Sequence, residues 1–352
     1  MPRLLLHHID VINEEYISGW CFHRIIPRHS LRLEFQLGTE PIGHTFCNKA
    51  RDDVQRAGLH ATGSCGFEFI FPRHLDLSGD GEFRATCFNG LIPVFKIAIK
   101  SVRSVLRPER PVFFVHIPKT AGTSFNNHVH PWFGYGKWHS HIEVLDLATQ
   151  RKLINPGHYI AGHIPLYKLR EIEPDFSKLD LHTIFRHPID QLHSHLAWLK
   201  GIGTNPDSGF FKTHQPVIQE LSLRMQGAEL NYASGVEKFI ASMEGFQFEF
   251  FDNIQTRYLL DSRPARVSNA DLNRAFDNLS AFKTFGTTEH YQDYLDLCAR
   301  YYQQKTSIQS TRHNPAKVAA LFDKTDPSIL HAIDPLICYD NRLYQHILDS
   351  RT

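Results

Sequence analysis

Hydrophobic and polar residues alternate with a period of two over the first hundred residues of the chain. The segment 31–37, LRLEFQL, places four apolar side chains on one face and Arg32, Glu34 and Gln36 on the other. The segments 82–88 and 94–100 repeat this alternation between turns rich in Gly, Asp and Pro. Such alternation is typical of half-buried antiparallel strands. The pattern predicts an all-β domain, built as a sandwich or a small barrel.

The pattern changes after residue 110. Apolar runs of strand length now precede stretches with helical spacing, and the runs lie at 112–117, 159–163 and 181–185. The helix after the third run is expected from about Pro188 to Lys200, and an apolar stripe indicates another helix over 291–302. Strands that alternate with helices predict an α/β domain in which helices flank a parallel sheet.

Length and composition fit two ordinary domains. The chain has 352 residues, of which 42% are hydrophobic and 21% charged, and its net charge is +1, so no overall field favours nucleic acid. We expect the all-β domain at 1–100, a basic linker at 101–110 and the α/β domain at 111–352. The apolar start, MPRLLLHH, is too short for a signal sequence or a membrane span, which predicts no integral membrane segment and a cytoplasmic protein.

The six cysteines are widely spaced and form no CxxC pair. Wide spacing in a large chain favours small, reduced and buried cysteines. Four of them lie in the first hundred residues, so a disulfide in that segment stays open.

The run 112–117 leads into PKTAGTS, a segment with the features of a phosphate-binding loop. In a parallel sheet, ligands bind beyond the carboxyl ends of strands, where helix N-termini present free N–H groups. Small residues let the backbone approach an oxyanion, hydroxyl groups donate to it, and lysine adds a full charge. The lysine precedes the glycine, so the segment is not a Walker loop. The candidate phosphate-binding residues are Lys119, Thr120, Ala121, Gly122, Thr123 and Ser124.

The segment HIPKTAGTS resembles the 5′-phosphosulfate loop of carbohydrate sulfotransferases, the group that includes heparan sulfate 2-O-sulfotransferase. These enzymes use 3′-phosphoadenosine 5′-phosphosulfate as the sulfuryl donor. A second signature of the family, a strand that ends in Arg before a helix that bears Ser, is similar to IFRHPIDQLHSHLAWLK at 184–200. The resemblance implies a sulfotransferase fold, in which Arg186 and Ser194 hold the 3′-phosphate. Considered separately, a salt-bridged arginine and a surface serine are the simpler interpretation.

Three further segments extend the resemblance from about residue 111 to 315. NIQTRYLL (253–260) and FGTTEHYQDYLDLCARYY (285–302) are similar to downstream segments of the family, and STRHNP (310–315) falls where the family has a loop near the nucleotide. Arg312 and Asn314 are thereby candidates for nucleotide binding and Arg257 for substrate binding. Structural ion pairs and loop turns are the alternative for all three.

Sulfuryl transfer requires a cation at the leaving phosphate oxygen and a base for the acceptor hydroxyl. Lys119 is expected to be that cation. The segment PGHYIAGHIPLYKL (156–169) resembles the Gly-His element of the family, which makes His163 the proposed base. A neighbouring histidine of the family is Ala161 here, so any role it has is missing. A buried, purely structural His163 is the alternative.

The segment WHSHIE contains His139 and His141, for which two interpretations compete. Together with Glu143 they suggest metal ligands, but no third ligand follows at a fixed spacing. We therefore predict no required metal and assign the two histidines to the acceptor substrate or to the surface.

The first domain resembles a β-sandwich module attached to bacterial glycan-modifying enzymes, on segments such as GWCF (19–22) and GFEFIFP (66–72). This resemblance implies a carbohydrate-contacting role for the domain. We expect a bacterial protein, cytoplasmic or peripheral at the inner membrane face, whose partner is a carbohydrate acceptor rather than nucleic acid. A domain that only aids folding is the alternative.

The expected function is transfer of a sulfuryl group to a hydroxyl of a glycan, polysaccharide or glycolipid. A nucleotide-dependent kinase or NTPase, or a glycan-binding protein with a decayed transferase fold, are the alternatives. The acceptor sugar and the oligomeric state are not indicated by the sequence.

Overall fold

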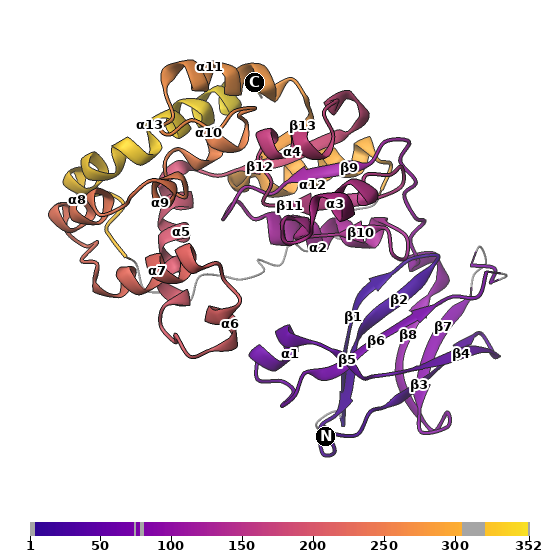
Figure 1. Ribbon diagram of the computed structural model, residues 1–352. Coiled ribbons are helices and arrows are strands. Elements are labelled where there is room, and N and C mark those ends of the chain that lie inside the picture. Colours follow the sequence, from indigo (N-terminus) through magenta and orange to yellow (C-terminus); the bar gives the residue numbers. More distant parts are fainter. Residues whose placement is uncertain (1–3, 74, 78–80, 305–320, 351–352) are drawn as a thin grey trace. The chain divides into compact units, whose positions relative to one another are not determined.

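The computed structural model describes residues 4–73, 75–77, 81–304 and 321–350, and the chain divides into two compact units (Figure 1). The first unit comprises Met1–Arg107 and Asn127–Trp138, and the second Pro108–Asn126 and His139–Thr352. The sequence placed 127–138 in the second domain, whereas in the structure this segment packs with the first. Asn13 contributes to this packing, because its Nδ2 donates to the Phe133 carbonyl at 3.0 Å.

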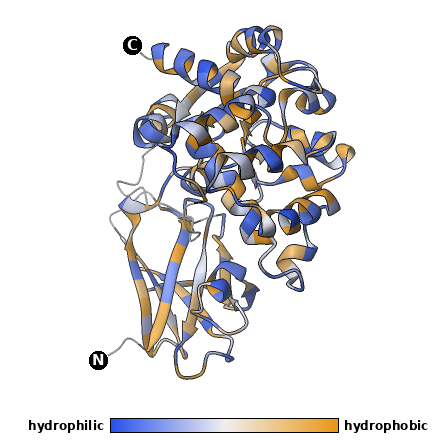
Figure 2. Ribbon diagram, turned by 90° about the vertical axis from the view of Figure 1, so that its left-hand side faces the viewer, coloured by the Kyte–Doolittle hydropathy of each residue, from blue (hydrophilic) through white to orange (hydrophobic). Residues whose placement is uncertain are grey.

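Two antiparallel sheets of four strands form the first unit, in the orders β1-β2-β6-β5 and β4-β3-β7-β8. The strands alternate between hydrophobic and hydrophilic residues, as Figure 2 shows. They are β1 (Leu5–Ile12), β2 (Tyr16–His23), β3 (Arg32–Leu37), β4 (Glu40–Phe46), β5 (Lys49–Ala50), β6 (Ser64–Ile70), β7 (Glu82–Cys87) and β8 (Ile92–Ala98), with a short helix α1 (Asp52–Arg56) and a 3₁₀ turn η1 (Ile99–Ser101).

The inward faces of the two sheets share one aromatic core. Leu33 and Phe35 of β3 are fully buried, as the period-two pattern predicts. Phe35 stacks on Phe69 of the other sheet with ring centroids 4.4 Å apart, and on its own neighbour Phe83 at 5.4 Å. The expected all-β sandwich is therefore present.

A five-stranded sheet in the order β10-β11-β9-β12-β13 forms the centre of the second unit. Its longer strands pair in parallel, and β9 and β12 are buried along their whole length. Burial on both faces explains why these runs are continuously apolar. The strands are β9 (Val112–Val115), β10 (Trp138–His139), β11 (Tyr159–Gly162), β12 (Asp180–Phe185) and β13 (Phe282–Thr287).

Helices surround this sheet and extend into a second helical layer (Figure 1). The predicted helix from about Pro188 to Lys200 is confirmed as α5, which spans Pro188–Ile202. Pro188 occupies its first turn, where proline is favourable. The helices are α2 (Gly122–Val129), α3 (Leu147–Leu153), α4 (Leu166–Ile172), α5 (Pro188–Ile202), α6 (Gly209–Lys212), α7 (Pro216–Arg224), α8 (Ala233–Ala241), α9 (Phe246–Glu249), α10 (Ile254–Tyr258), α11 (Asn269–Leu279), α12 (Tyr291–Tyr301) and α13 (Pro327–Asp349). The 3₁₀ turns are η2 (His130–Trp132), η3 (Ile142–Val144), η4 (Phe176–Lys178), η5 (Met225–Gly227) and η6 (Thr288–His290).

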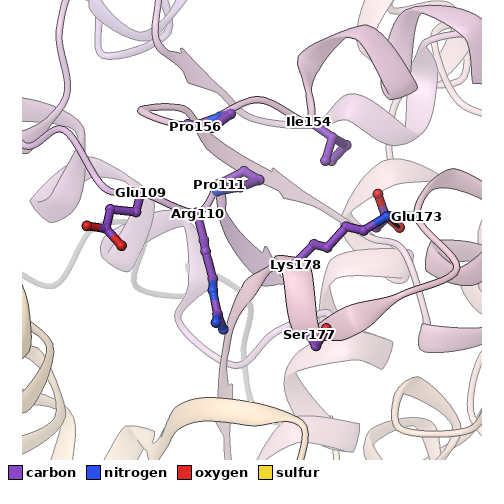
Figure 3. A pocket seen from close by; sticks show the side chains of 8 residues that line it. All are labelled: Glu109, Arg110, Pro111, Ile154, Pro156, Glu173, Ser177 and Lys178. Atoms are coloured by element: carbon purple, nitrogen blue, oxygen red, sulfur yellow. Dashed lines mark hydrogen bonds and ion pairs between the residues drawn. The ribbon is translucent and has the colours of Figure 1, made fainter.

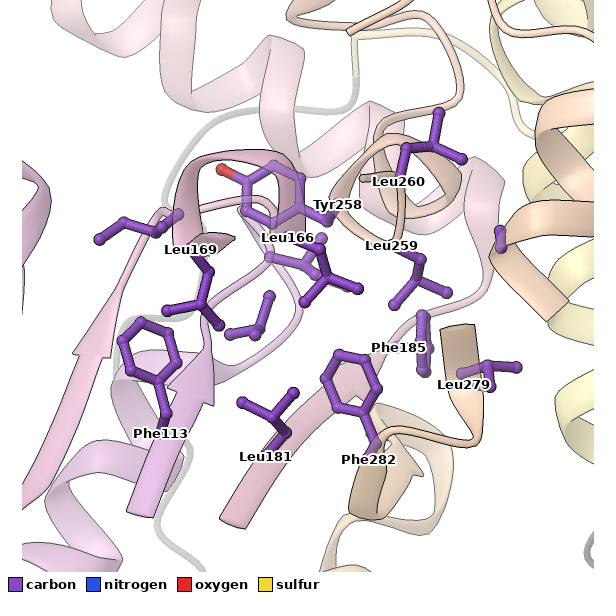
Figure 4. Packing of buried hydrophobic residues seen from close by; sticks show 14 of the residues in the cluster. Phe113, Leu166, Leu169, Leu181, Phe185, Tyr258, Leu259, Leu260, Leu279 and Phe282 are labelled. Atoms are coloured by element: carbon purple, nitrogen blue, oxygen red, sulfur yellow. The ribbon is translucent and has the colours of Figure 1, made fainter. Parts of the chain in front are cut away.

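One face of the sheet packs against α4, α10 and α11. Phe113 and Leu181, on neighbouring strands, are fully buried beneath Leu166, Leu169 and Leu259 (Figure 4). Helices α5, α7, α8 and α13 enclose a separate apolar cluster. The expected α/β architecture is thus present, and the fully buried strands β9 and β12 lie at its centre.

All six cysteines are free thiols, and five of them are buried. The expectation of reduced, buried cysteines is confirmed. No helix in the described part of the chain is both long and apolar enough to cross a membrane.

Candidate functional site

The two segments expected to bind phosphate meet at the carboxyl ends of β9 and β12. These strands are paired in parallel, with Val112 opposite Asp180 and Val115 opposite Thr183. The segments that follow β9 and β12 therefore leave the sheet at the same edge, the one formed by the carboxyl ends of the parallel strands. There the Arg186 guanidinium donates from Nη1 to the Lys119 carbonyl at 3.1 Å. The structure brings together residues that lie 67 positions apart in the sequence.

The loop after β9 has a backbone conformation that L-amino acids seldom adopt. Lys119 and Ala121 have φ angles of +66° and +64°, in the left-handed region. Each costs about 1–2 kcal/mol relative to an ordinary conformation. Left-handed residues within such loops turn successive N–H groups toward one side and create concavities that bind anions. Strain of this kind is concentrated at functional sites, so it supports a ligand-binding role for this loop.

The hydroxyl of Thr120 has a structural role. It donates to the Ile117 carbonyl at 2.9 Å, and the residue is fully buried. The sequence suggested that this hydroxyl donates to a bound phosphate, and the structure instead uses it to close the loop. Of the other hydroxyl residues in the segment, Thr123 is exposed and Ser124 is nearly buried.

Helix α2 begins at Gly122, and the Phe125 N–H donates to the Ala121 carbonyl at 3.1 Å. The N–H groups of the first helical turn have no carbonyl partner within the helix, and they carry the positive end of its dipole. A Cβ atom on Gly122 would lie 2.1 Å from Cδ2 of His116. Glycine is therefore required here because the His116 ring packs directly against the loop.

Two cationic side chains lie close together at this edge. Burial lowers the pKa of Lys119, and the positive charge of Arg186 lowers it further. Lys119 has no ion-pair partner among the described residues. Two neighbouring cations in a partly buried position are unfavourable unless a negative charge compensates them. The arrangement therefore favours an anionic ligand.

Two glutamines fix the position of Arg186 and of the loop. Gln255 of α10 accepts from the Arg186 backbone N–H at 2.9 Å and donates to its carbonyl at 2.8 Å. Gln191 of α5 donates to the Pro118 carbonyl at 2.9 Å. The buried carboxylate of Asp340 accepts from the Gln255 N–H at 3.1 Å and so anchors α10. Sequence reasoning missed both glutamines, because nothing in their local pattern shows which strand end they face.

Arg257, the candidate substrate residue of the same segment, is a buried structural residue. Its guanidinium forms an ion pair with Asp252 and donates to the carbonyls of Pro264 at 2.7 Å and Ala265 at 3.1 Å. Its Nε donates to the Asp252 carbonyl at 2.8 Å. With its donors used in this way, Arg257 does not contribute to the site, and the alternative of a structural ion pair describes it.

Helix α5 carries Ser194 and two histidines with different environments. Ser194 is half-buried, about 9 Å along the helix axis from Pro188. His193 accepts from the Leu321 N–H at 3.1 Å. His195 is buried, and its Nδ1 has no hydrogen-bond partner among the described residues. Burial lowers its pKa to about 3, and the nearby charges of Lys119 and His163 contribute to this shift. The position of His195 near Lys119 and His163 was not predicted from the sequence.

His163 follows β11, on the other side of β9 from β12. Its Nδ1 donates to the His116 carbonyl at 2.6 Å. Since a carbonyl only accepts, the proton of the neutral ring is on Nδ1 and the lone pair is on Nε2. Its backbone N–H donates to Oε2 of Glu143 at 3.1 Å, and Oε1 of Glu143 is 3.1 Å from Nδ1 of His141. A Cβ atom on Gly162 would lie 2.9 Å from that Oε2, so glycine allows the carboxylate to approach.

The charges around His163 favour its neutral form. Burial lowers its pKa, the negative charge of Glu143 opposes this, and the charges of His141 and Lys119 lower it further. Burial also holds the pKa of His116 well below its ordinary value, and the rings of His116 and His163 are 4.2 Å apart. The hydrogen bond that His141 donates to Glu143 raises the pKa of His141. The site therefore combines a neutral, basic imidazole with nearby cations.

The two histidines of WHSHIE point to different neighbours. His139 pairs with His158, at 3.3 Å between Nε2 and Nδ1, and their rings are stacked. His141 joins Glu143 and His163, and the three offer ligand atoms within 4.8 Å of one another. The sequence showed no third ligand at a fixed spacing, and the structure provides His163, which follows β11.

The described pocket lies at the opposite edge of the sheet. It has a volume of about 470 Å³ and is lined by Glu109, Arg110, Pro111, Ile154, Pro156, Glu173, Ser177 and Lys178 (Figure 3). Pro111 precedes β9 and Lys178 precedes β12, so this hollow adjoins the amino ends of the strands. Lys178 is paired with Glu173 at 3.4 Å. The pocket is thus separate from the loop that carries Lys119.

The structure brings Lys119, Arg186 and His163 to one edge of the sheet, and His116 and His195 complete their surroundings. Arg312 and Asn314 lie outside the described residues. No protein-family model matches the chain, and no curated protein matches it in sequence.

Replacing Gly122 by alanine tests the packing of the loop. We expect Gly122→Ala to lower the free energy of unfolding by about 1–3 kcal/mol, because the new methyl group overlaps the buried His116 ring. The control is Gly201→Ala, also in a helix but with open space around it, which should stabilise the protein by about 0.4–1 kcal/mol. Urea unfolding of the full chain measures both. Equal stabilities would contradict the close contact between loop and histidine.

Proposed function

We propose that this protein transfers a sulfuryl group from 3′-phosphoadenosine 5′-phosphosulfate to a hydroxyl of a carbohydrate. The observation that carries the proposal is the contact between the Arg186 guanidinium and the Lys119 carbonyl. It means that two segments, each suited to bind one phosphate, lie at adjacent strand ends. A single molecule with two phosphate groups can then bind both, whereas an ordinary monophosphate uses only one.

The loop and the start of α2 would hold the 5′-phosphosulfate. The left-handed residues Lys119 and Ala121 shape the loop, and the N–H groups after them are the donors. The Lys119 ammonium would stabilise the negative charge that develops on the leaving phosphate oxygen. Its lowered pKa reflects burial and a cationic neighbour, and a bound anion would raise that pKa again.

Arg186 and Ser194 would hold the 3′-phosphate. The arginine side chain offers a planar fork of donors that matches phosphate geometry, and Gln255 fixes its backbone on both sides. Ser194 is on the helix that begins directly after this strand, and its hydroxyl adds a neutral donor. These residues thus provide charge and direction for the nucleotide end of the donor.

His163 would act as the base. Its Nε2 lone pair takes the proton of the acceptor hydroxyl as that oxygen attacks sulfur. The new O–S bond forms while the S–O bond to the 5′-phosphate breaks, and adenosine 3′,5′-bisphosphate leaves with the electron pair. The bond from Nδ1 to the His116 carbonyl keeps the imidazole in the tautomer that this step requires.

The same geometry disfavours a kinase or NTPase. Those of these enzymes that have a Walker loop use a hydroxyl beside the loop lysine to bind magnesium. Thr120 is next to Lys119, but its hydroxyl is buried and donates to the Ile117 carbonyl. The acceptor in the proposal is a carbohydrate because the sequence of the first unit also resembles modules of glycan-modifying enzymes.

Nucleotide binding provides the first test. Calorimetry should show that adenosine 3′,5′-bisphosphate binds the full chain more tightly than ATP with magnesium. Lys119→Ala and Arg186→Lys should each weaken binding roughly 10–100-fold, because each removes charge-assisted or forked contacts to phosphate. Lys152→Ala, an exposed lysine on α3, is the matched control and should leave binding unchanged. Tighter binding of ATP would indicate the kinase alternative.

A substitution at His163 separates catalysis from folding. Asparagine can still donate from Nδ2 to the His116 carbonyl, but it lacks the basic Nε2. We expect His163→Asn to reduce transfer of radiolabelled sulfate to carbohydrate acceptors by about 10²–10⁴-fold, with nucleotide affinity unchanged. Turnover near the wild-type rate would exclude His163 as the base. A wild-type protein that binds the nucleotide and carbohydrate without transfer would indicate a decayed enzyme.

The pH dependence of transfer should follow the two shifted groups. The rate rises with pH as His163 loses its proton, and since burial lowers its pKa, the midpoint of this rise should lie below 6.5. The kcat/KM for transfer, which reports the groups of the free enzyme, falls on the alkaline side as Lys119 loses its charge, below its ordinary pKa of 10.5. Glu143→Gln removes a charge that raises the pKa of His163, so it should move the acidic limb to lower pH. Movement to higher pH would contradict this role for Glu143.

A further inference from the structure

Three side chains beside the phosphate loop form a cluster whose donor atoms suit a metal ion. His141, Glu143 and His163 offer two imidazole nitrogens and one carboxylate oxygen, all within 4.8 Å of one another. They come from two parts of the chain, the turn after β10 and the end of β11. The segment WHSHIE alone does not reveal this set. Its third member, His163, follows β11 and is positioned by the pairing of β11 with β9.

The hydrogen bonds of the cluster orient its ligand atoms. Histidines that bind metals usually donate their other ring N–H to a carbonyl or a carboxylate. His163 does so, with Nδ1 on the His116 carbonyl at 2.6 Å, which leaves the Nε2 lone pair available. Glu143 is fixed by the His163 backbone N–H at 3.1 Å, and Gly162 leaves space for this approach. His141 has a largely exposed side chain, so it can move to close around an ion.

The donor set defines the kind of ion. Two imidazoles and one carboxylate, with a further position open to water, suit Zn²⁺ and related transition metals, whereas Mg²⁺ and Ca²⁺ prefer oxygen ligands. The charge of Glu143 favours a cation here, and the nearby charge of Lys119 opposes it. The His116 ring is 4.2 Å from that of His163, but its Nε2 edge faces Gly122, so it is not counted as a ligand.

We propose that His141, Glu143 and His163 bind a divalent transition metal, with Zn²⁺ as the best fit, and that this ion inhibits the enzyme. Inhibition follows because the ion occupies the Nε2 lone pair of His163. The metal site stands on the geometry of the cluster alone, whereas the inhibitory effect depends on the proposed sulfuryl transfer. The ion is thus a competitor of the proton that His163 accepts, and it is not required for transfer.

The binding test uses the full chain after removal of metals with a chelator. Titration with zinc chloride, followed by calorimetry and by measurement of bound metal, should show one tight site per chain. His141→Ala and Glu143→Gln should each weaken it at least tenfold, since loss of supporting residues around a metal already costs about 10–100-fold. His139→Ala is the matched control, because this histidine is in the same segment but pairs with His158. Cobalt absorption bands that change with His141→Ala would confirm the ligand.

The results of these experiments test the metal site and its inhibitory role separately. Absence of tight zinc binding, or tight binding that His141→Ala leaves unchanged, would overturn the metal site. Zinc should lower the transfer rate of the wild type, and a higher zinc concentration should be needed for His141→Ala, each compared with its own metal-free rate. Transfer that is insensitive to saturating zinc, or lost after chelation, would overturn the inhibitory role. Tight binding in a protein without any transfer activity would support the metal site and contradict the proposed function.

Discussion

The parallel pairing of β9 with β12 is the constraint on which the site depends. Residues 112–115 pair in register with 180–183, so the segments that follow β9 and β12 leave the sheet side by side. The Arg186 guanidinium then reaches the Lys119 carbonyl, and Gln255 holds the arginine backbone from α10. On the other side, β11 pairs with β9 and places His163 next to the His116 carbonyl. A shift of either strand by one residue would exchange its side chains between the two faces of the sheet and would separate these groups.

Burial gives this edge its chemical character. Burial is the main cause of the fall in the pKa of Lys119, and the charge of Arg186 lowers it further. The three histidines around it have lowered pKa values for the same reason, so they stay neutral and contribute no charge of their own. The result is a small region with two fixed cations, N–H groups of a helix terminus and several uncharged imidazoles. An anion is the ligand that such a region stabilises most, and a neutral imidazole beside it is suited to accept a proton.

The sequence predicted the features that depend on local pattern. Period-two alternation, the apolar runs of the parallel strands and the proline at the start of α5 are signals carried by neighbouring residues, and all three were confirmed. Features that depend on strand order were missed. Gln255 and the inward position of His195 follow from which elements meet at the sheet edge. The side chains of Arg257 and Thr120 were candidates for ligand binding, whereas in the structure they donate to backbone carbonyls. A residue type that can bind phosphate can equally satisfy the protein backbone, and the local sequence does not distinguish the two uses.

The Nε2 atom of His163 connects the proposed chemistry with the metal site. The hydrogen bond that places the ring proton on Nδ1 leaves a single lone pair directed away from β9. A proton, an acceptor hydroxyl and a transition metal ion all use that lone pair, so a residue prepared for one is prepared for the others. Glu143 increases the preference for positive species there, while Lys119 reduces it. The balance between these two charges therefore sets how strongly the imidazole attracts either a proton or a metal ion. A bound phosphosulfate would neutralise Lys119, so donor binding would favour the approach of a cation to the same histidine.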